Sequence, residues 1–394
     1  MTAPPNGAPR GVAVLGSTGS IGASALDVVR ASNGRLRVVA LSARSRLDRL
    51  KKQAQEFRPR FVVAADEQEA AEHSWRGLPE ETELLVGPEG LERVVGEESV
   101  DAVVAAIVGR AGLESTLAAI QAGKRVALAN KETLVVAGPI VRKMLEERGE
   151  APTQLIPVDS EHSAVFQSLS CGKHEEVERV VLTASGGPFR TWDTEQLAQV
   201  TVDEALAHPT WDMGPKITID SATMMNKALE VIEARWLFDL PAEKIEVVIH
   251  PQSMIHSMVE FVDGAVVAQL GPPDMRLPIQ HALDHPHREP GPAEKLDWKR
   301  MHRLEFEPAD FERFPALELG FTCARTGGTS GAVLSAANEA AVQSFLDGEL
   351  HFTEIVPACR SILEAHHHDP DPSLERLIEL DRWAREEIHT WVCA

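Results

Sequence analysis

Short apolar runs alternate with segments of helical spacing in the first half of the chain. The runs that we predict as strands are Val12–Leu15, Arg37–Leu41, Phe61–Ala64, Asp101–Val108 and Arg125–Ala129. Residues 21–30 and 112–123 have helical periodicity, and Gly123 is placed to end the second of these helices. Because strands that are apolar throughout are covered on both faces, this alternation predicts a parallel α/β sheet.

The pattern changes after about residue 150. Strands of a mixed sheet are predicted at 153–158, 177–184, 244–250 and 265–270, with long polar loops across 185–215. Residues 283–296 are rich in Pro, His and Gly, which is typical of a linker. Helical periodicity then returns at 335–345, 353–367 and 374–391. The second half therefore predicts a mixed sheet followed by a helical region.

Composition limits the possible partners. The chain has 394 residues, and 60 Asp and Glu against 39 Lys and Arg give a formal net charge of −21. Nucleic-acid binders usually carry a basic surplus, so neither nucleic acid nor an anionic membrane surface is an expected partner. No apolar run reaches the roughly 18–20 residues of a membrane helix, and residues 1–9 do not have the pattern of a secretory signal. The four cysteines form no CxxC motif, which is typical of reduced thiols in a cytoplasmic protein.

A glycine-rich turn, Gly16-Ser-Thr-Gly-Ser-Ile-Gly22, joins the first predicted strand to the first predicted helix. Backbone N–H groups and a helix N-terminus in this position bind the phosphates of a dinucleotide. The GxxGxxG spacing is by itself a weak signal, because the commoner motif is GxGxxG, and a structural turn without a ligand is the alternative. The strand–turn–helix context favours a dinucleotide site.

The end of the second predicted strand indicates which dinucleotide. Sites for NAD usually place an acid here to bind the ribose 2′-OH. This chain has Arg44 and Arg46 instead, with no carboxylate before Asp48. A guanidinium group suits the 2′-phosphate of NADPH, while a solvated basic stretch is the alternative for either arginine. The sequence leaves open which residue binds that phosphate.

Acidic residues follow the predicted strand that ends near Val158. In an extended chain Asp159 and Glu161 point to the same side, and two converging carboxylates form half of a site for a hard divalent cation. A helix cap or a solvated acidic pair is the alternative.

A second polar group lies between residues 220 and 230. Asn226, Lys227 and Glu230 share one face of a predicted helix, and Ser221 lies where that helix is predicted to begin. An amide, an ammonium and a carboxylate on one face suit an anion and a metal ion side by side. An exposed pair of charged residues one helical turn apart is the alternative.

Longer motifs appear in order along the chain. They are Gly16–Gly22, Ala105–Gly109, Asn130–Glu132, Pro157–His162, Ser185–Phe189, His208–Gly214, Asp220–Glu230, His250–His256 and Gly271–Arg276. In this order they resemble the 1-deoxy-D-xylulose 5-phosphate reductoisomerase family, over essentially the whole chain from Gly11 into the C-terminal helices.

The resemblance implies an N-terminal NADPH-binding domain, a central catalytic domain that also forms a homodimer, and a C-terminal helical domain. Together with the residue pattern, it predicts an α/β fold. The expected parts are a disordered lead-in at 1–10, a Rossmann-like parallel-sheet domain at 11–152, an α+β catalytic domain with a mixed sheet at 153–285, a linker at 286–310 and a helical bundle domain at 311–394.

The resemblance also implies roles for individual residues. Those expected to bind NADPH are Gly16, Thr18, Gly19, Ser20, Ile21, Arg44, Ala105, Ala106, Ile107, Asn130, Glu132 and Met275. Those expected to bind Mg²⁺, Mn²⁺ or Co²⁺, and to be catalytic with Lys131, are Asp159, Glu161 and Glu230. Those expected to bind the phosphosugar substrate are Ser160, Ser185, His208, Trp211, Met213, Ser221, Asn226 and Lys227.

The implied reaction rearranges 1-deoxy-D-xylulose 5-phosphate and reduces the product with NADPH to 2-C-methyl-D-erythritol 4-phosphate, in the non-mevalonate pathway of isoprenoid biosynthesis. The rearrangement follows either a retroaldol–aldol route or a ketol shift, and a divalent ion stabilises the charge that both routes develop. Two other functions stay open: an NADPH-dependent oxidoreductase acting on another phosphorylated substrate, and a non-catalytic NADPH-sensing protein. The predicted metal carboxylates argue against the second.

Overall fold

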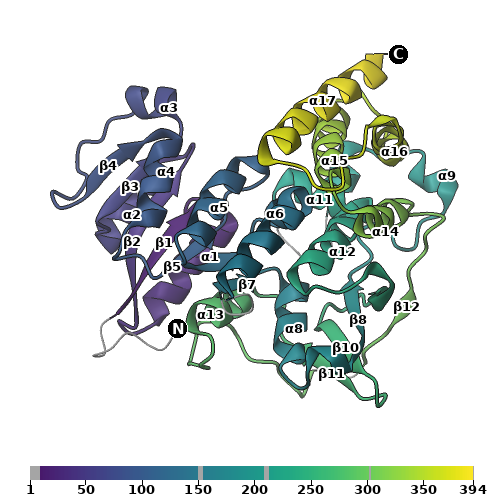
Figure 1. Ribbon diagram of the computed structural model, residues 1–394, viewed down its shortest axis with the longest axis horizontal. Coiled ribbons are helices and arrows are strands. Elements are labelled where there is room, and N and C mark those ends of the chain that lie inside the picture. The colour runs from purple at the N-terminus through teal and green to yellow at the C-terminus, as the bar shows by residue number, and fades with distance from the viewer. Residues whose placement is uncertain (1–8, 150–153, 208–212, 301–302, 394) are drawn as a thin grey trace. The chain divides into compact units, whose positions relative to one another are not determined.

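The structure, a computed structural model, describes residues 9–149, 154–207, 213–300 and 303–393 (Figure 1). The chain forms two compact units. The first contains the described residues up to Thr133, with Lys143–Ser163 and Asp274–Lys295. The second contains Leu134–Arg142, Ala164–Pro273 and the described residues from Leu296 onward. Within the described ranges no helix combines the length and the apolar character that a membrane span needs.

The first unit is built on a parallel sheet, as predicted, and this sheet has seven strands. Its strands are β1 Arg10–Leu15, β2 Leu36–Ala43, β3 Phe61–Ala64, β4 Glu83–Val86, β5 Ala102–Ala105, β6 Arg125–Leu128 and β7 Leu155–Pro157. They lie in the order β4-β3-β2-β1-β5-β6-β7, and every pair is parallel. The order reverses beside β1, which lies between β2 and β5. In open α/β sheets such a reversal leaves a ligand-binding crevice at the carboxyl ends of the strands.

All but the last of the following helices connect these strands. They are α1 Ser20–Ala31, α2 Leu47–Phe57, α3 Glu67–Glu72, α4 Gly87–Gly96, the 3₁₀ turn η1 Arg110–Gly112, α5 Leu113–Gln121 and α13 Arg276–Asp284. Helices α6 (Glu132–Arg148) and α8 (Ser160–Leu169) have residues in both units. Helix α13 joins the first unit through buried charge: Arg35 pairs with Asp284 at 2.5 Å, and Arg125 donates to the carbonyl of His285 at 2.6 Å.

The second unit contains the mixed sheet. Its strands are β8 Val177–Ala184, β9 Ile245–Ile249, β10 Ile255–Phe261, β11 Val266–Leu270 and β12 Glu307–Pro308. They lie in the order β11-β10-β8-β9-β12. β8 and β9 are parallel, and the other pairs are antiparallel. The predicted mixed sheet is therefore confirmed.

The second unit also contains short helices between its strands and longer helices toward the C-terminus. They are η2 His174–Glu176, α9 Thr194–Leu197, α10 Val202–Leu206, α11 Pro215–Ala222, α12 Met225–Leu237, η3 Ala242–Lys244, α14 Ala316–Thr326, α15 Ser330–Leu346, η4 Phe352–Glu354, α16 Ile355–Ala365 and α17 Leu374–Cys393. The predicted C-terminal helices correspond to α15, α16 and α17. Helix α14 packs so closely on α12 that a Cβ on Gly320 would lie 2.6 Å from the Cα of Ala228.

Several sequence-based assignments were wrong. The strand expected at 153–158 is β7, which pairs with β6 in the parallel sheet and not with the mixed sheet. The expected polar loop at 185–215 contains α9 and α10, which are too short to show periodicity and begin with the caps Asp193 and Thr201. Strands β4 and β10 were not predicted, and Arg10 belongs to β1 and not to a lead-in. The division into functional domains stays a prediction.

Candidate functional site

The carboxyl edge of the parallel sheet gathers the predicted site residues of the first unit. Gly16 follows β1, Arg44 follows β2, Ala106 follows β5, Asn130 lies just beyond β6, and Asp159 lies just beyond β7. Because the strands are parallel, the loops after them emerge at one edge of the sheet. The topology therefore explains how residues far apart in sequence come to share one side of this unit.

The glycine turn lies against the loop after β5. Gly16 has φ +82°, and a Cβ there would lie 2.6 Å from the carbonyl oxygen of Ala106. The N–H of Ala106 donates to the carbonyl of Leu15 at 3.0 Å, and the N–H of Gly19 closes the turn on Gly16 at 3.1 Å. Helix α1 begins at Ser20, so the turn presents the start of a helix. The predicted phosphate-binding turn and the predicted nicotinamide segment are thus neighbours in the structure.

A buried polar network supports this turn from below. The hydroxyl of Ser17 donates to Gln53 Oε1 at 2.7 Å, and Gln53 Nε2 donates to the carbonyl of Ser17 at 2.9 Å. Ser42 completes the network, since its hydroxyl accepts from the N–H of Gly16 at 3.0 Å. Sequence analysis missed Gln53, although it is a polar residue on the buried face of α2, beside Leu50 and between apolar positions.

The arginines after β2 contact different groups. Arg44 is largely exposed and lies 3.5 Å from Asp66. Arg46 and Arg49 both donate to the carbonyl of Thr18, at 3.4 and 3.0 Å. Arg49 was not predicted, and with Arg46 it fixes the backbone of the glycine turn.

Asn130 ties two loops of the first unit together. Its Nδ2 donates to the carbonyls of Ile107 and, at 2.8 Å, Gly109. Its Oδ1 accepts from the N–H and the hydroxyl of Thr133, each at 2.8 Å. The side chain therefore orients the segment after β5 and the start of α6, where Glu132 is buried.

Lys131 and Asp159 form a nearly buried ion pair with a separation of 2.6 Å. Burial by itself would raise the pKa of the Asp159 carboxyl. The ammonium of Lys131, followed by the ring of His162, more than offsets burial, so the pKa lies well below its usual range. Asp159 is therefore a carboxylate at neutral pH, the form that binds a cation.

The acidic pair begins a helix instead of continuing a strand. Helix α8 starts at Ser160, so Glu161 lies in its first turn, and the extended geometry expected for Asp159 and Glu161 was wrong. The two side chains nevertheless bring carboxylate oxygens within 4.8 Å of each other. The hydroxyl of Ser160 donates to Glu161 at 2.5 Å. The first turn of a helix favours negative charge through its exposed N–H groups.

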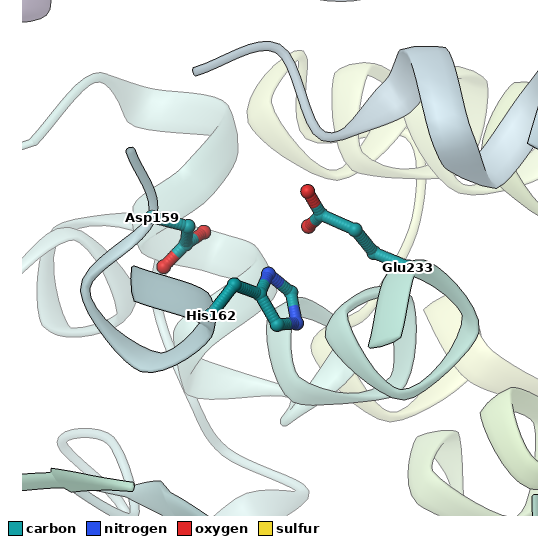
Figure 2. Close-up of side chains that lie close together, drawn as sticks. All are labelled: Asp159, His162 and Glu233. Atoms are coloured by element: carbon teal, nitrogen blue, oxygen red, sulfur yellow. The ribbon is translucent and has the colours of Figure 1, made fainter. Parts of the chain in front are cut away.

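His162 was missed as a site residue. It is fully buried on the first turn of α8, and a ring nitrogen lies within 4.8 Å of an Asp159 oxygen. Figure 2 shows both side chains. The signal was in the sequence, because His162 stands three residues after Asp159 and therefore one turn from it once a helix forms.

In the second unit, Ser185 lies on the loop after β8, beside the end of α11 that carries Ser221. Ser221 is in the last turn of α11, so the expectation that it begins a helix was wrong. Gly187 has φ +68°, and a Cβ there would lie 2.6 Å from the carbonyl of Ser221. The hydroxyl of Ser185 accepts from the N–H of Gly187 at 3.3 Å. The structure thus brings together the segments that carry these two predicted substrate-binding serines.

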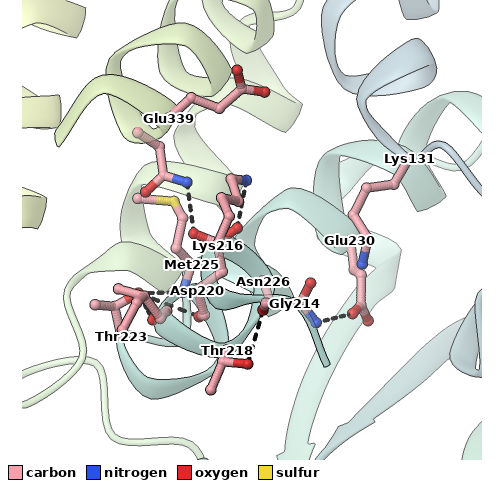
Figure 3. Close-up of polar contacts among 12 residues, drawn as sticks. Lys131, Gly214, Lys216, Thr218, Asp220, Thr223, Met225, Asn226, Glu230 and Glu339 are labelled. Atoms are coloured by element: carbon pink, nitrogen blue, oxygen red, sulfur yellow. Dashed lines mark hydrogen bonds and ion pairs between the residues drawn. The ribbon is translucent and has the colours of Figure 1, made fainter. Parts of the chain in front are cut away.

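The predicted polar face of α12 is buried. Asn226 Nδ2 donates to Glu230 Oε1 at 2.6 Å (Figure 3). Lys227 forms an ion pair with the other carboxylate oxygen. Lys227 is 3% exposed and Glu230 is 0% exposed. The alternative of an exposed helix pair is therefore wrong. Burying charge is costly, which makes this group a candidate for function.

The remaining predicted site residues are His208, Trp211, Met213 and Met275. His208 and Trp211 fall outside the described residues, while Met213 is half-buried just before α11. Met275 is the residue that precedes α13 in the first unit, between Asp274 and Arg276, which pair at 2.6 Å.

Comparisons with known proteins agree along nearly the whole chain. The family model of 1-deoxy-D-xylulose 5-phosphate reductoisomerase matches residues 12–138, and models of its C-terminal domains match residues 155–238 and 270–387. The reductoisomerase of Rhodopirellula baltica is 51% identical, over 95% of this chain and 93% of its own length. That of Geotalea uraniireducens is 52% identical, over 95% and 97%.

Solved structures agree as well. The reductoisomerase from Zymomonas mobilis in complex with NADPH matches with a TM-score of 0.90 and 44% identity, covering 98% of this chain and 99% of that one. A reductoisomerase in complex with NADPH, fosmidomycin and magnesium matches with a TM-score of 0.90 and 40% identity, covering 97% and 98%. The chain belongs to the 1-deoxy-D-xylulose 5-phosphate reductoisomerase family.

Proposed function

We propose that this chain catalyses the NADPH- and divalent-metal-dependent conversion of 1-deoxy-D-xylulose 5-phosphate to 2-C-methyl-D-erythritol 4-phosphate, a step in isoprenoid precursor biosynthesis. The observation that carries the proposal is the near full-length match to reductoisomerases, one of them solved with NADPH and magnesium. The buried, charged groups of α8 and α12 are the residue types that this chemistry requires.

The glycine turn and the segment after β5 would hold NADPH. The backbone N–H groups of Thr18, Ser20 and Ile21, at the start of α1, would donate to the phosphates, while the N–H of Gly19 closes the turn. Ala105, Ala106 and Ile107 would line the nicotinamide, and Arg44 is exposed at the end of β2, where a 2′-phosphate would bind. Bound NADPH supplies the hydride for the reduction.

Asp159, Glu161 and Glu230 are the proposed ligands of Mg²⁺, Mn²⁺ or Co²⁺. Carboxylate oxygens suit these hard cations, and the lowered pKa of Asp159 keeps that ligand charged. The ion would act as a Lewis acid toward the substrate's oxygens. Lys131, paired with Asp159, is positioned to add positive charge or transfer a proton beside those oxygens.

The substrate phosphate is assigned to Ser185, Ser221, Asn226 and Lys227. These hydroxyl, amide and ammonium groups come from neighbouring parts of the second unit and offer hydrogen-bond donors to an anion. Ser160 would contact the reacting oxygens. His208, Trp211 and Met213 would close over the substrate and exclude water before hydride transfer.

A cytoplasmic homodimer completes the proposal. β11 is an edge strand of the mixed sheet, and its Val266 is 54% exposed while the nearby Val262 is 64% exposed. An edge strand with exposed apolar side chains is suited to pairing with another chain. Light scattering of the purified protein measures the mass that tests this part.

The activity test is one spectrophotometric assay. We expect NADPH oxidation, followed at about 340 nm, the usual nicotinamide wavelength, when 1-deoxy-D-xylulose 5-phosphate and Mg²⁺ or Mn²⁺ are both present. Chelation of the metal should abolish the signal, and added Mn²⁺ should restore it. Oxidation with another phosphorylated substrate alone would favour a different oxidoreductase, and NADPH binding without turnover would favour a sensing protein.

Gln53 offers a test of the cofactor half-site. We expect Gln53→Leu to raise the Kd of NADPH about tenfold, because it removes both hydrogen bonds between Gln53 and Ser17 and leaves the buried carbonyl of Ser17 without the amide that donates to it, at a cost of about 1–3 kcal/mol. Quenching of protein fluorescence on titration with NADPH measures this Kd. Gln55→Leu, on the exposed face of the same helix, is the control and should leave the Kd unchanged. An equal Kd in both variants would remove Gln53 from the support of the turn.

A further inference from the structure

A buried carboxylate precedes the proposed phosphate-binding serine. Asp220 is 2% exposed in the last turn of α11, directly before Ser221. One of its oxygens lies 2.5 Å from the ammonium of Lys216, one helical turn earlier. The other accepts a hydrogen bond of 2.8 Å from Nδ2 of Asn338. None of these residues is among those assigned to substrate, metal or cofactor.

Asn338 comes from a helix that is otherwise packed with small and apolar side chains. It is 0% exposed on α15, between the buried residues Ala337 and Ala340. A buried amide destabilises a core unless it is paired. A buried charge can often be replaced by apolar residues without loss of stability. Stability alone therefore gives a weak reason for an amide and a carboxylate to meet here.

Lys216 and Asn338 are the polar partners of the Asp220 carboxylate, and a neighbouring thiol adds no charge to this group. Burial raises the pKa of the Cys359 thiol on α16, and the negative charge of Asp220 raises it further. The thiol thus stays protonated and adds no competing charge. Lys216 and Asn338 then hold the carboxylate from its own helix and from α15.

The position of α11 matters because Ser221 has little room to move. Its carbonyl lies so close to Gly187 that a Cβ on that glycine would approach to 2.6 Å. A rotation or shift of α11 would change the spacing between Ser221 and the loop of Ser185. Among the residues that the structure describes, the hydrogen bond from Asn338 to Asp220 is a polar contact that joins α15 to α11.

We propose that Asn338 and Asp220 are positioning residues that fix α11, and through it Ser221, for binding of the substrate phosphate. This inference rests on the proposed role of Ser221. The C-terminal helix α15 would then set substrate affinity without touching the substrate. Because the residues that we assign to NADPH lie in the first unit, cofactor affinity should not depend on this contact.

The test compares Asn338→Leu with Ser335→Ala, which changes another buried polar residue of α15. We expect Asn338→Leu to raise KM for 1-deoxy-D-xylulose 5-phosphate about tenfold, the size of a lost charged hydrogen bond, with the Kd of NADPH changed less than twofold. Ser335→Ala should change neither. An unchanged KM in Asn338→Leu, or equal changes in KM and in NADPH affinity, would overturn the proposal.

A charge exchange keeps the test decisive if the leucine variant does not fold. Asn338→Asp places a second carboxylate against Asp220 and should raise KM more than Asn338→Leu does. Adding Asp220→Asn restores one amide and one carboxylate, and KM should fall back by at least about threefold, because coupled residues are not additive. No recovery in the double variant would contradict the pairing. If the unmodified chain lacks metal-dependent activity, the proposed function has failed. If the unmodified chain is active but the Asn338 variants keep its KM, only this inference has failed.

Discussion

Glu230→Gln should lower kcat at least about a hundredfold while changing the Kd of NADPH less than twofold. Losing even an indirect support of a metal costs about 10- to 100-fold, and Glu230 is a proposed direct ligand. The substitution removes one negative charge from the ligands of the metal ion. It also takes away the carboxylate that pairs with the buried ammonium of Lys227. Stopped-flow and steady-state NADPH oxidation measure kcat, and fluorescence titration measures the cofactor Kd.

The matched control for this variant is Glu243→Gln. Glu243 is exposed in η3 of the same unit, so the same loss of one charge at the surface should leave kcat unchanged. A Glu230→Gln protein that retains turnover with an unchanged requirement for Mg²⁺ would remove Glu230 from the metal site. Normal kcat at saturating Mg²⁺, with a higher Mg²⁺ concentration needed for half-maximal rate, would instead show that this carboxylate contributes affinity but no catalysis.

The net charge of −21 bears on how the protein binds its phosphorylated ligands. A strongly acidic protein must bind phosphorylated molecules against its own field, so affinity has to come from local donors. The donors that we propose are the start of α1 in the first unit, and Lys227 with Asn226 in the second. Long-range attraction should contribute little to capture of the substrate.

Residue patterns predicted the parts of this fold that a short stretch of sequence reveals by itself. The apolar runs around Val12 and Val103 are strands because each is buried on both faces, and the glycine turn lies where a strand ends and a helix begins. Asn226 and Glu230 share a helix face because they are four residues apart, which the sequence alone shows. In these cases the pattern that predicts the element lies within a few neighbouring residues, although the partners that bury the strands are distant in sequence.

The parts that could not be predicted depend on distant partners. Gln53 is a structural support because Ser17 lies behind it, and α13 belongs to the first unit because Arg35 reaches Asp284. β10 contains Ser257 and Glu260, which break the apolar pattern of a buried strand. Helix α8 begins at Ser160, one residue past Asp159, and such boundaries are set by capping contacts that spacing does not show.

Gly22→Ala should raise the Kd of NADPH about 10- to 100-fold, the equivalent of a 1–3 kcal/mol overpacking cost expressed in the turn. A Cβ on Gly22 would lie 2.4 Å from the carbonyl oxygen of Gly16 and 2.5 Å from the Cα of Ser17. Both are backbone atoms, so neither can rotate aside and the turn itself must open. Isothermal titration calorimetry measures the Kd of NADPH directly.

Gly96→Ala separates this effect from a general loss of stability. Gly96 ends α4 in the same unit, and a Cβ there meets no atom within 4 Å. Alanine at a helix end with free space should leave both the thermal midpoint and the NADPH Kd unchanged. If Gly22→Ala binds NADPH as tightly as Gly96→Ala does, the turn tolerates opening and the cofactor phosphates are bound elsewhere. If its Kd rises while kcat at saturating NADPH is retained, the close packing of Gly22 on Gly16 shapes the phosphate-binding turn and has no part in the chemical step.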